Sequence, residues 1–285
     1  MIILKNIRFA ALLLCMALGV GNVAQAQKAP TGAINGKFSV SADKQVYFSK
    51  GNLQYQPSTK TWRFAAHQYD LINEDNAKAY SSPNFQGWMD QFVWGYGENP
   101  LKKDDWDRYP EHGFVDWGTN TISNGGNNNW RTLTIGEWKY VLFSRNTSSG
   151  IRFAKCRVNG TYGLMVFPDN WKASDYHLNC GYVNDANQAY GNWLSNQLSK
   201  EDWAKLEVKG VVFLPCHNGF CSESNNFVNW ESQNRKGDYY WSSSEHNDFN
   251  GMILKIGDSD SVDPYYCTWD SKLAPHNVRL VCPVK

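Results

Sequence analysis

The sequence has no strong excess of either charge and, beyond its first 26 residues, no long apolar run. It has 28 Lys and Arg residues and 27 Asp and Glu residues. Loss of residues 1–26 would remove Lys5 and Arg8, which leaves 26 cationic and 27 acidic residues and a net charge of −1. Phosphate backbones and anionic membrane surfaces attract cationic proteins, so nucleic acid and membrane surfaces are not expected as partners. A membrane-spanning helix needs roughly 20 apolar residues, so no transmembrane segment is expected.

Several signatures of catalysis and metal binding are also missing. The chain has no C-x-x-C pair, no H-x-H or H-x-x-x-H pair, no G-x-S-x-G segment and no glycine-rich phosphate loop. Each of these spacings brings metal ligands, a nucleophile or phosphate-binding amides together locally. We therefore expect a protein that is not an enzyme and uses no metal and no cofactor. The carboxylates of Asp258, Asp260 and Asp263 are more typical of an exposed turn, although a structural calcium stays open.

The first 26 residues have the features of a signal peptide. Lys5 and Arg8 precede an apolar run over 9–20, and the small residues of Ala24-Gln25-Ala26 form a cleavage site. The apolar run is too short for a membrane anchor, so we expect export and a secreted or cell-surface location. The expected organisation is a signal peptide at 1–26, a short polar leader at 27–36 and a single domain at 37–285.

Six cysteines follow the predicted cleavage site, an even number that permits up to three disulfides in an oxidising compartment. They are Cys156, Cys180, Cys216, Cys221, Cys267 and Cys282. Proximity in the sequence favours pairing Cys216 with Cys221 and Cys267 with Cys282. The alternative is that some are free buried thiols, which pack as small apolar groups.

Short runs of alternating apolar residues predict a series of strands. Two hairpins are expected, one joining 37–40 to 45–48 and one joining 151–158 to 162–167 through Asn159-Gly160, residues that tolerate positive φ. Between 73 and 129 the periodicity is lost while large aromatic residues persist, which predicts a long loop region held to the core by its rings. Further strands are expected at 53–55, 62–64, 211–214, 239–241, 252–254, 265–267 and 278–281.

Two helices are expected as well. Thr134 and Glu137 have the spacing of a capping box and precede Trp138, the first apolar residue of a helical face. A second helix is expected to begin at Ser199, with acidic residues in its first turn, and to end near Gly210. Together these signals predict an α+β fold in which two main helices pack on short antiparallel sheets joined by long loops.

Several blocks of the chain resemble a known group of folds. The segment 130–138 is similar to the R-L-P-T-x-x-E-W helix entry of the formylglycine-generating-enzyme branch of C-type-lectin-like folds. The segments 239–244 and 277–281 resemble the closing W-S-S and V-R-L-V blocks of secreted bacterial "major paralogous" domains, and 164–171 and 211–215 look like further blocks. The resemblance spans about 38–281 and implies a C-type-lectin-like fold, which hosts sugar binders, protein binders and oxidases.

What the resemblance implies for function depends on the branch. For the enzymes of the formylglycine-generating-enzyme branch, the resemblance implies either a copper-binding cysteine pair beside a G-G-S-W type segment or an iron site of several histidines. This sequence has neither pattern. In lectin-like folds the ligand surface is built from the late loops, where this chain places amides, acids and rings suited to sugar or protein recognition. Tyr240 and Trp241 are expected in the core. The expected ligand-binding residues are Asn226, Asn229, Trp230, Glu245, Asn247, Asp248, Phe249, Tyr265, Tyr266, Trp269 and Asp270, with His246 in the same stretch.

The function best supported by the sequence is an exported, non-catalytic domain that binds a glycan or a protein at or outside the cell surface. One alternative is a metal-dependent oxidase of the formylglycine-generating-enzyme type. Another is a hypervariable display protein diversified by a retroelement. Ligand identity, disulfide connectivity, surface anchoring and oligomeric state stay open.

Overall fold

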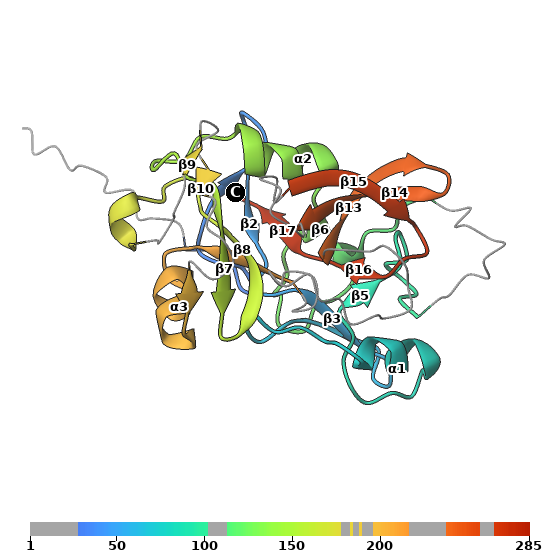
Figure 1. Cartoon of the computed structure of the whole chain (residues 1–285). Coiled ribbons are helices and arrows are strands. Elements are labelled where there is room, and N and C mark those ends of the chain that lie inside the picture. The colour runs from blue at the N-terminus through green and yellow to red at the C-terminus, as the bar shows by residue number, and fades with distance from the viewer. Residues whose placement is uncertain are drawn as a thin grey trace, which may run out of the picture.

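The computed structural model describes residues 28–101, 113–177, 183–184, 188–189, 196–216, 238–256 and 265–285. Strands account for 35% of this part of the chain and helices for 15%. The expected α+β fold with two main helices is therefore wrong. The described chain is mainly β-structure, arranged in four small sheets (Figure 1).

The helices in the described ranges are short. They are α1 (Asp75–Ser81), α2 (Ile135–Lys139) and α3 (Lys200–Glu207), with 3₁₀ turns η1 (Trp117–Thr119) and η3 (Ala173–Asp175) and a π-helical turn η2 (Tyr140–Ser144). None of these elements has the length and apolar character that a membrane crossing needs.

The strands are mostly short too. They are β1 (Phe38–Ser39), β2 (Gln45–Phe48), β3 (Leu53–Gln56), β4 (Thr61–Phe64), β5 (Gln91–Phe92), β6 (Arg131–Thr132), β7 (Phe153–Val158), β8 (Thr161–Val166), β9 (Val183–Asn184), β10 (Gln188–Ala189), β11 (Gln197–Leu198), β12 (Val212–Cys216), β13 (Asp238–Asn247), β14 (Asn250–Ile256), β15 (Tyr265–Ser271), β16 (His276–Asn277) and β17 (Leu280–Pro283).

The helix start signals are real, but they do not determine how far a helix runs. The Thr134 hydroxyl accepts a hydrogen bond from the Glu137 amide at 3.1 Å, and the Glu137 carboxylate accepts one from the Thr134 amide at 2.9 Å, so the predicted capping box is confirmed. Yet α2 ends at Lys139 and continues only as the π-helical turn. α3 is only eight residues long. Such short helices cover parts of the sheets and do not form a layer of their own.

The helix α1 lies inside the region that the sequence predicts as loop. Glu74, its N-cap residue, makes no side-chain cap hydrogen bond. The element therefore lacks the local start signal that marks α2 and α3. The expectation that aromatic rings hold this region to the core is confirmed, because Phe92, Trp94 and Trp117 are all buried in one cluster.

Both predicted hairpins are confirmed, because β1 pairs antiparallel with β2 and β7 with β8. The strands β3 and β4 form a further hairpin. Asn159 and Gly160 turn the β7–β8 hairpin with φ values of 46° and 86°, the left-handed region that this two-residue turn requires. The chemistry of this turn thus favours the pairing of β7 with β8.

Two sheets connect segments that are far apart in the sequence. The first has the strand order β1-β2-β17-β6, so β17, near the end of the chain, lies between β2, near its start, and β6, near its middle. The third has the order β15-β14-β13-β16-β5 and appears as the red and orange sheet on the right of Figure 1. The remaining sheets are β12-β8-β7-β10-β9, in which β11 also pairs with β7, and the hairpin β3-β4.

Three apolar clusters make up the core, because several strands are buried on both faces. In β8, Leu164 belongs to one cluster and its neighbour Met165 to another. Trp203 and Leu206 of α3 belong to the same cluster as Met165. Tyr240 and Trp241 are buried in two different clusters, which confirms their predicted place in the core. Side chains on successive residues of a strand point to opposite faces, so near-continuous apolar runs indicate such double burial.

The packed structure begins before residue 37. Ile34 lies in the first core cluster, and its amide donates a hydrogen bond to the Phe48 carbonyl at 2.8 Å. Gly36 passes so close to Gly210 that a Cβ atom at position 36 would lie 2.3 Å from the Gly210 carbonyl oxygen. The second half of the predicted leader is therefore part of the folded domain.

Candidate functional site

The described late residues meet at the outer end of the β13–β14–β15 sheet. In the described part of the chain three large apolar side chains are exposed, namely Val208, Phe249 and Trp269. The last two belong to this sheet end, where Trp269 is 52% and Phe249 54% exposed. His246 stacks parallel to Trp269, with 5.4 Å between ring centroids and 4° between ring planes. We call His246, Phe249 and Trp269 the aromatic patch.

A tight turn between β13 and β14 supports the patch. The Asn247 carbonyl oxygen Oδ1 accepts hydrogen bonds from the Phe249 amide at 2.9 Å, the Asn250 amide at 2.9 Å and the Asn250 side chain at 3.1 Å. A side-chain oxygen that caps nearby amides in this way holds a turn in one conformation. Asn247 therefore positions Phe249 and is already engaged with the backbone.

A buried lysine fixes the same turn from beneath. The Lys272 ammonium, only 2% exposed, pairs with the Glu245 carboxylate and donates to the Asp248 carbonyl at 3.0 Å. It also lies 4.7 Å from the ring centroid of Trp94, within the range of a cation–π contact. The Lys272 amide bonds to the Phe249 carbonyl at 3.0 Å. This one residue ties β15 to the turn through both backbone and side chain.

A histidine and an aspartate form a second polar pair under the sheet. His276 Nε2 lies 3.0 Å from Asp270 Oδ2, and the His276 side chain is 5% exposed. The imidazole contacts the rings of Tyr239 and Trp241, at centroid distances of 4.8 and 4.6 Å. Asp270 thus has an internal partner and orients β16 against β15.

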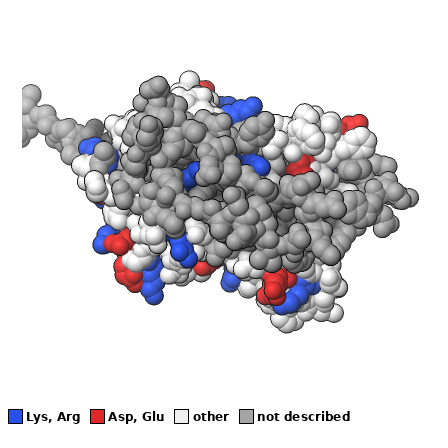
Figure 2. All heavy atoms as spheres, viewed as in Figure 1, with Lys and Arg blue, Asp and Glu red and all other residues white. Residues whose placement is uncertain are grey.

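The electrostatic character of this sheet end is mildly acidic. Glu245 is 54% exposed along its side chain even though it pairs with Lys272. Figure 2 shows mainly uncharged atoms over the outer end of the β14–β15 hairpin, with small acidic spots and no basic one in that view. A ligand that reaches the rings therefore meets apolar area bordered by carboxylate oxygens, which accept hydrogen bonds.

The structure brings together six of the predicted ligand residues, Glu245, Asn247, Asp248, Phe249, Trp269 and Asp270. Tyr265 and Tyr266 lie in β15, but their side chains are outside the described part. Asn226, Asn229 and Trp230 also lie outside it. Sequence reasoning missed Lys272 and His276. The signal for Lys272 was strand alternation, which places residues 270 and 272 on one face.

One of the two predicted cysteine pairings is wrong. Cys156 and Cys282 are free, buried thiols, so the expected pairing of Cys267 with Cys282 is wrong. The two residues lie in different sheets, because Cys282 pairs with Tyr47 in the first sheet and Cys267 with Leu254 in the third. Cys216 is disulfide-bonded, and its partner is neither of the two free cysteines. Because Cys221 lies outside the described residues, its pairing with Cys216 stays a prediction.

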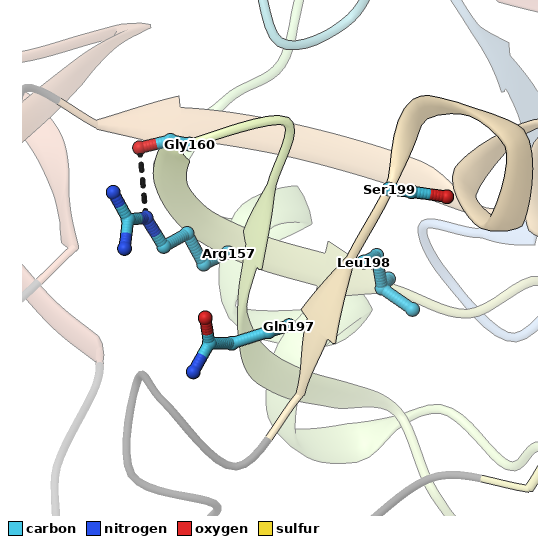
Figure 3. Close-up of a pocket in the computed structure, with 5 residues that line it drawn as sticks. All are labelled: Arg157, Gly160, Gln197, Leu198 and Ser199. Carbon is cyan, nitrogen blue, oxygen red and sulfur yellow. Dashed lines mark hydrogen bonds between the residues drawn. The ribbon is translucent and has the colours of Figure 1, made fainter.

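A shallow hollow lies elsewhere, between β7, β11 and the start of α3. Its volume is about 330 Å³, and its lining includes Arg157, Gly160 and Gln197. In Figure 3 the side chains of Arg157 and Gln197 extend to the same side, while Leu198 and Ser199 point elsewhere. The Arg157 Nε donates to the Gly160 carbonyl at 3.0 Å. None of the predicted ligand residues lines this hollow, so the aromatic patch is the better candidate.

Among the residues that the structure describes, no three His, Cys, Asp or Glu side chains lie close enough together to hold a metal ion. Comparisons with models of protein families, with curated proteins and with solved structures found no match to this chain. The resemblance to the formylglycine-generating-enzyme branch and to "major paralogous" domains therefore stays a prediction.

Proposed function

We propose that this chain is an exported, non-catalytic binding domain and that the aromatic patch contacts its ligand, a glycan or a protein. The observation that carries the proposal is the exposure of Phe249 and Trp269 at the same end of one sheet. His246 stacks on Trp269, and Asn247 and Lys272 hold the turn that carries Phe249. Exposing large rings costs free energy, and grouped exposed rings on a rigid support are typical of recognition surfaces.

The chemistry of the patch suits a glycan best. One face of the Trp269 indole stacks on His246, and about half of the side chain stays open to solvent. A flat, half-exposed ring offers apolar area at low entropic cost, and carboxylates at the same end of the sheet, those of Glu245 and Asp248, can accept hydrogen bonds from hydroxyl groups. The polar and apolar faces of a sugar ring match such an arrangement.

The test compares glycan-array and calorimetric binding of the purified chain with binding of the Trp269→Ala and Phe249→Ala variants. We expect each variant to lose about fivefold or more in affinity, because truncating a central ring in a contact surface typically costs more than about 1 kcal/mol. Val208→Ala is the matched control, because Val208 is 73% exposed but lies just beyond α3, away from the patch.

Two results would count against the proposal, and a third would decide between the two ligand classes. Unchanged affinity in the Trp269→Ala, Phe249→Ala double variant would remove the patch as the site. Stoichiometric copper or iron in the purified protein would favour the oxidase alternative. Absence of glycan binding together with a protein ligand whose capture requires Trp269 would keep the patch and replace the glycan by a protein.

A further inference from the structure

Three side chains lie in one row across the end of the second sheet. Gln197 of β11 pairs with Arg157 of β7, and Arg157 in turn pairs with Tyr162 of β8. Residues that pair directly on neighbouring strands direct their side chains to the same face of a sheet. The row therefore presents an amide, a guanidinium and a phenol ring on one face, next to the Asn159-Gly160 turn that joins β7 to β8.

The guanidinium of Arg157 is held by two contacts within the β7–β8 hairpin. Its Nε donates a hydrogen bond to the Gly160 carbonyl at 3.0 Å. Its central carbon Cζ lies 5.1 Å from the centroid of the Tyr162 ring, within the range of a cation–π contact. Gly160 is itself fixed by the left-handed conformation of the turn. The guanidinium is therefore preorganised, which lowers the entropic cost of binding a ligand.

The terminal nitrogens of the same guanidinium have no partner within the described ranges of the chain. Nε uses its single N–H on Gly160, and Arg157 makes no ion pair or further side-chain hydrogen bond there. The buried Arg145, by contrast, pairs with Asp169. The N–H groups of a guanidinium form a planar fork that matches the two oxygens of a carboxylate. Arg157 thus offers an oriented fork without an internal carboxylate.

Arg157 lines the shallow hollow of about 330 Å³ between β7, β11 and the start of α3. Gly160 and Gln197, which line it too, are exposed, and Arg157 is half-buried, so the hollow is open to solvent. Figure 3 shows the Gln197 side chain on the same side as the guanidinium, whereas the Leu198 side chain points elsewhere. Ligand pockets have volumes of about 300–1,000 Å³, so this hollow suits one small, polar ring.

We propose that this hollow binds an acidic sugar residue of the uronic-acid type and that the terminal nitrogens of Arg157 hold its carboxylate. Arg157 is the one charged side chain among the described lining residues, which matches the single charge of a carboxylate better than the double charge of a phosphate. The amide and backbone groups around it match a ring that carries hydroxyl groups better than an apolar chain. The hollow lies on a different sheet from the aromatic patch, so this second site is independent of the ligand of the patch.

Two probes that differ in one group test the site. They are glucuronic acid and glucuronamide, in which a neutral amide replaces the carboxylate of the same ring. Each is titrated at neutral pH into the isotope-labelled chain, and the amide NMR resonances report both affinity and location. We expect glucuronate to bind at least about tenfold more tightly than glucuronamide, because hydrogen bonds between two charged groups are the stronger ones. The resonances of Gly160 and Leu198 should shift most.

Variants of Arg157 separate the planar fork from simple charge. Arg157→Gln removes the cation, so the affinity for glucuronate should fall about tenfold or more, to the level of glucuronamide. Arg157→Lys keeps a point charge without the fork and should recover little of the lost affinity. Lys44→Gln is the matched control, because it removes an exposed cation from the β1–β2 turn in another sheet and should bind glucuronate normally.

Several results would overturn the proposal. Equal affinities for glucuronic acid and glucuronamide would show that no carboxylate is recognised, and unchanged glucuronate affinity in a folded Arg157→Gln variant would remove the site. Resonance changes confined to Phe249 and Trp269 in the unaltered chain, a result that needs no variant, would place the carboxylate at the aromatic patch instead. Tighter binding of inorganic sulfate or phosphate than of glucuronate would replace the carboxylate by another anion. Trp269→Ala should leave glucuronate binding at the hollow unchanged, even if it abolishes binding at the patch.

Discussion

Arg145 Nη1 lies 2.7 Å from Asp169 Oδ1, and the arginine side chain is completely buried. The second carboxylate oxygen of Asp169 accepts hydrogen bonds from the Ser39 amide at 2.9 Å, the Ser39 hydroxyl at 2.7 Å and the Gln45 side chain at 2.8 Å. Burial lowers the pKa of Arg145 to about 10, although Asp169 favours its charged form. This pair connects the end of η2, the exit of β8 and the β1–β2 hairpin.

Removing the carboxylate should destabilise the fold strongly. Asp169→Ala leaves the Arg145 charge buried without its partner, and breaking a buried pair in this way costs about 3 kcal/mol or more. Urea unfolding followed by tryptophan fluorescence measures the loss. Lys78→Ala, which removes an exposed i,i+3 pair with Asp75, should leave the unfolding midpoint unchanged. Equal midpoints for Asp169→Ala and the unaltered chain would contradict the assignment.

The capping residue of α2 should give a pH-dependent stability. Burial alone would raise the pKa of Glu137, but hydrogen bonds from Arg131 and Thr134 and the Arg131 charge lower it below its ordinary value of 4.5. The folded state therefore releases this proton more readily than the unfolded state. The resulting stabilisation is present above about pH 4.5 and is lost as pH falls through the lower folded pKa.

Glu137→Gln tests this dependence because glutamine keeps the capping geometry and loses the charge. Unfolding free energies of both proteins, measured from pH 7 to pH 3, should differ by about 1 kcal/mol at pH 7. The difference should shrink below pH 4.5. A difference that stays constant over the whole range would show that the ionised carboxylate is not responsible.

Gly251 should tolerate no side chain, because the ring of Trp94 packs directly against it. A Cβ atom at this position would lie 2.6 Å from Trp94 Cδ1, and the Trp94 ring is buried against Lys272 with its Nε1 bonded to the Ser242 carbonyl. Gly251→Ala should therefore lower the free energy of unfolding by about 1–3 kcal/mol. In calorimetry with a glycan identified on the array, it should also weaken binding at the aromatic patch.

Gly136→Ala is the control for this substitution, since the nearest atom to its Cβ is Thr134 Oγ1 at 3.9 Å. Alanine is the better helix former, so this change within α2 should be neutral or stabilising by up to about 1 kcal/mol. A Gly251→Ala protein as stable as Gly136→Ala would mean that Trp94 moves aside without loss.

The thiol of Cys282 should be protected and unpaired. Burial raises the pKa of Cys282 to about 11, and only the thiolate reacts with an alkylating reagent. At pH 8, iodoacetamide should label the native protein about a hundredfold more slowly at Cys282 than it labels a free cysteine. After denaturation without a reductant, peptide mapping by mass spectrometry should find alkylated Cys282. A peptide in which Cys282 is cross-linked to another cysteine would contradict this.

Elements determined by neighbouring residues could be predicted from the sequence. The Asn159-Gly160 turn, the Thr134–Glu137 capping box and the β1–β2 hairpin all depend on contacts within a few positions. The proportion of strand to helix could not be predicted in this way. Capping signals show where a helix begins, but the short length of α2 and α3 is set by the surrounding sheets, so two clear helix starts led to a wrong fold class.

The residues of the candidate site could be predicted from the sequence, but the contacts that hold them could not. Aromatic and amide composition predicted Asn247, Phe249 and Trp269 as ligand-binding residues, and the structure places them at one sheet end. That Glu245 and Asp270 are held by Lys272 and His276 depends on pairing across strands, and no spacing in the sequence shows it.

The sequence by itself determined the turns, the helix starts and the supply of large rings, because backbone geometry and capping involve neighbouring residues. Only the tertiary structure decided that most rings fill three cores while Phe249 and Trp269 stay exposed. It also decided that Cys282 lies in a different sheet from Cys267. Exposure and strand neighbours are set by which distant segments pack together, and that choice depends on the free energy of the whole fold.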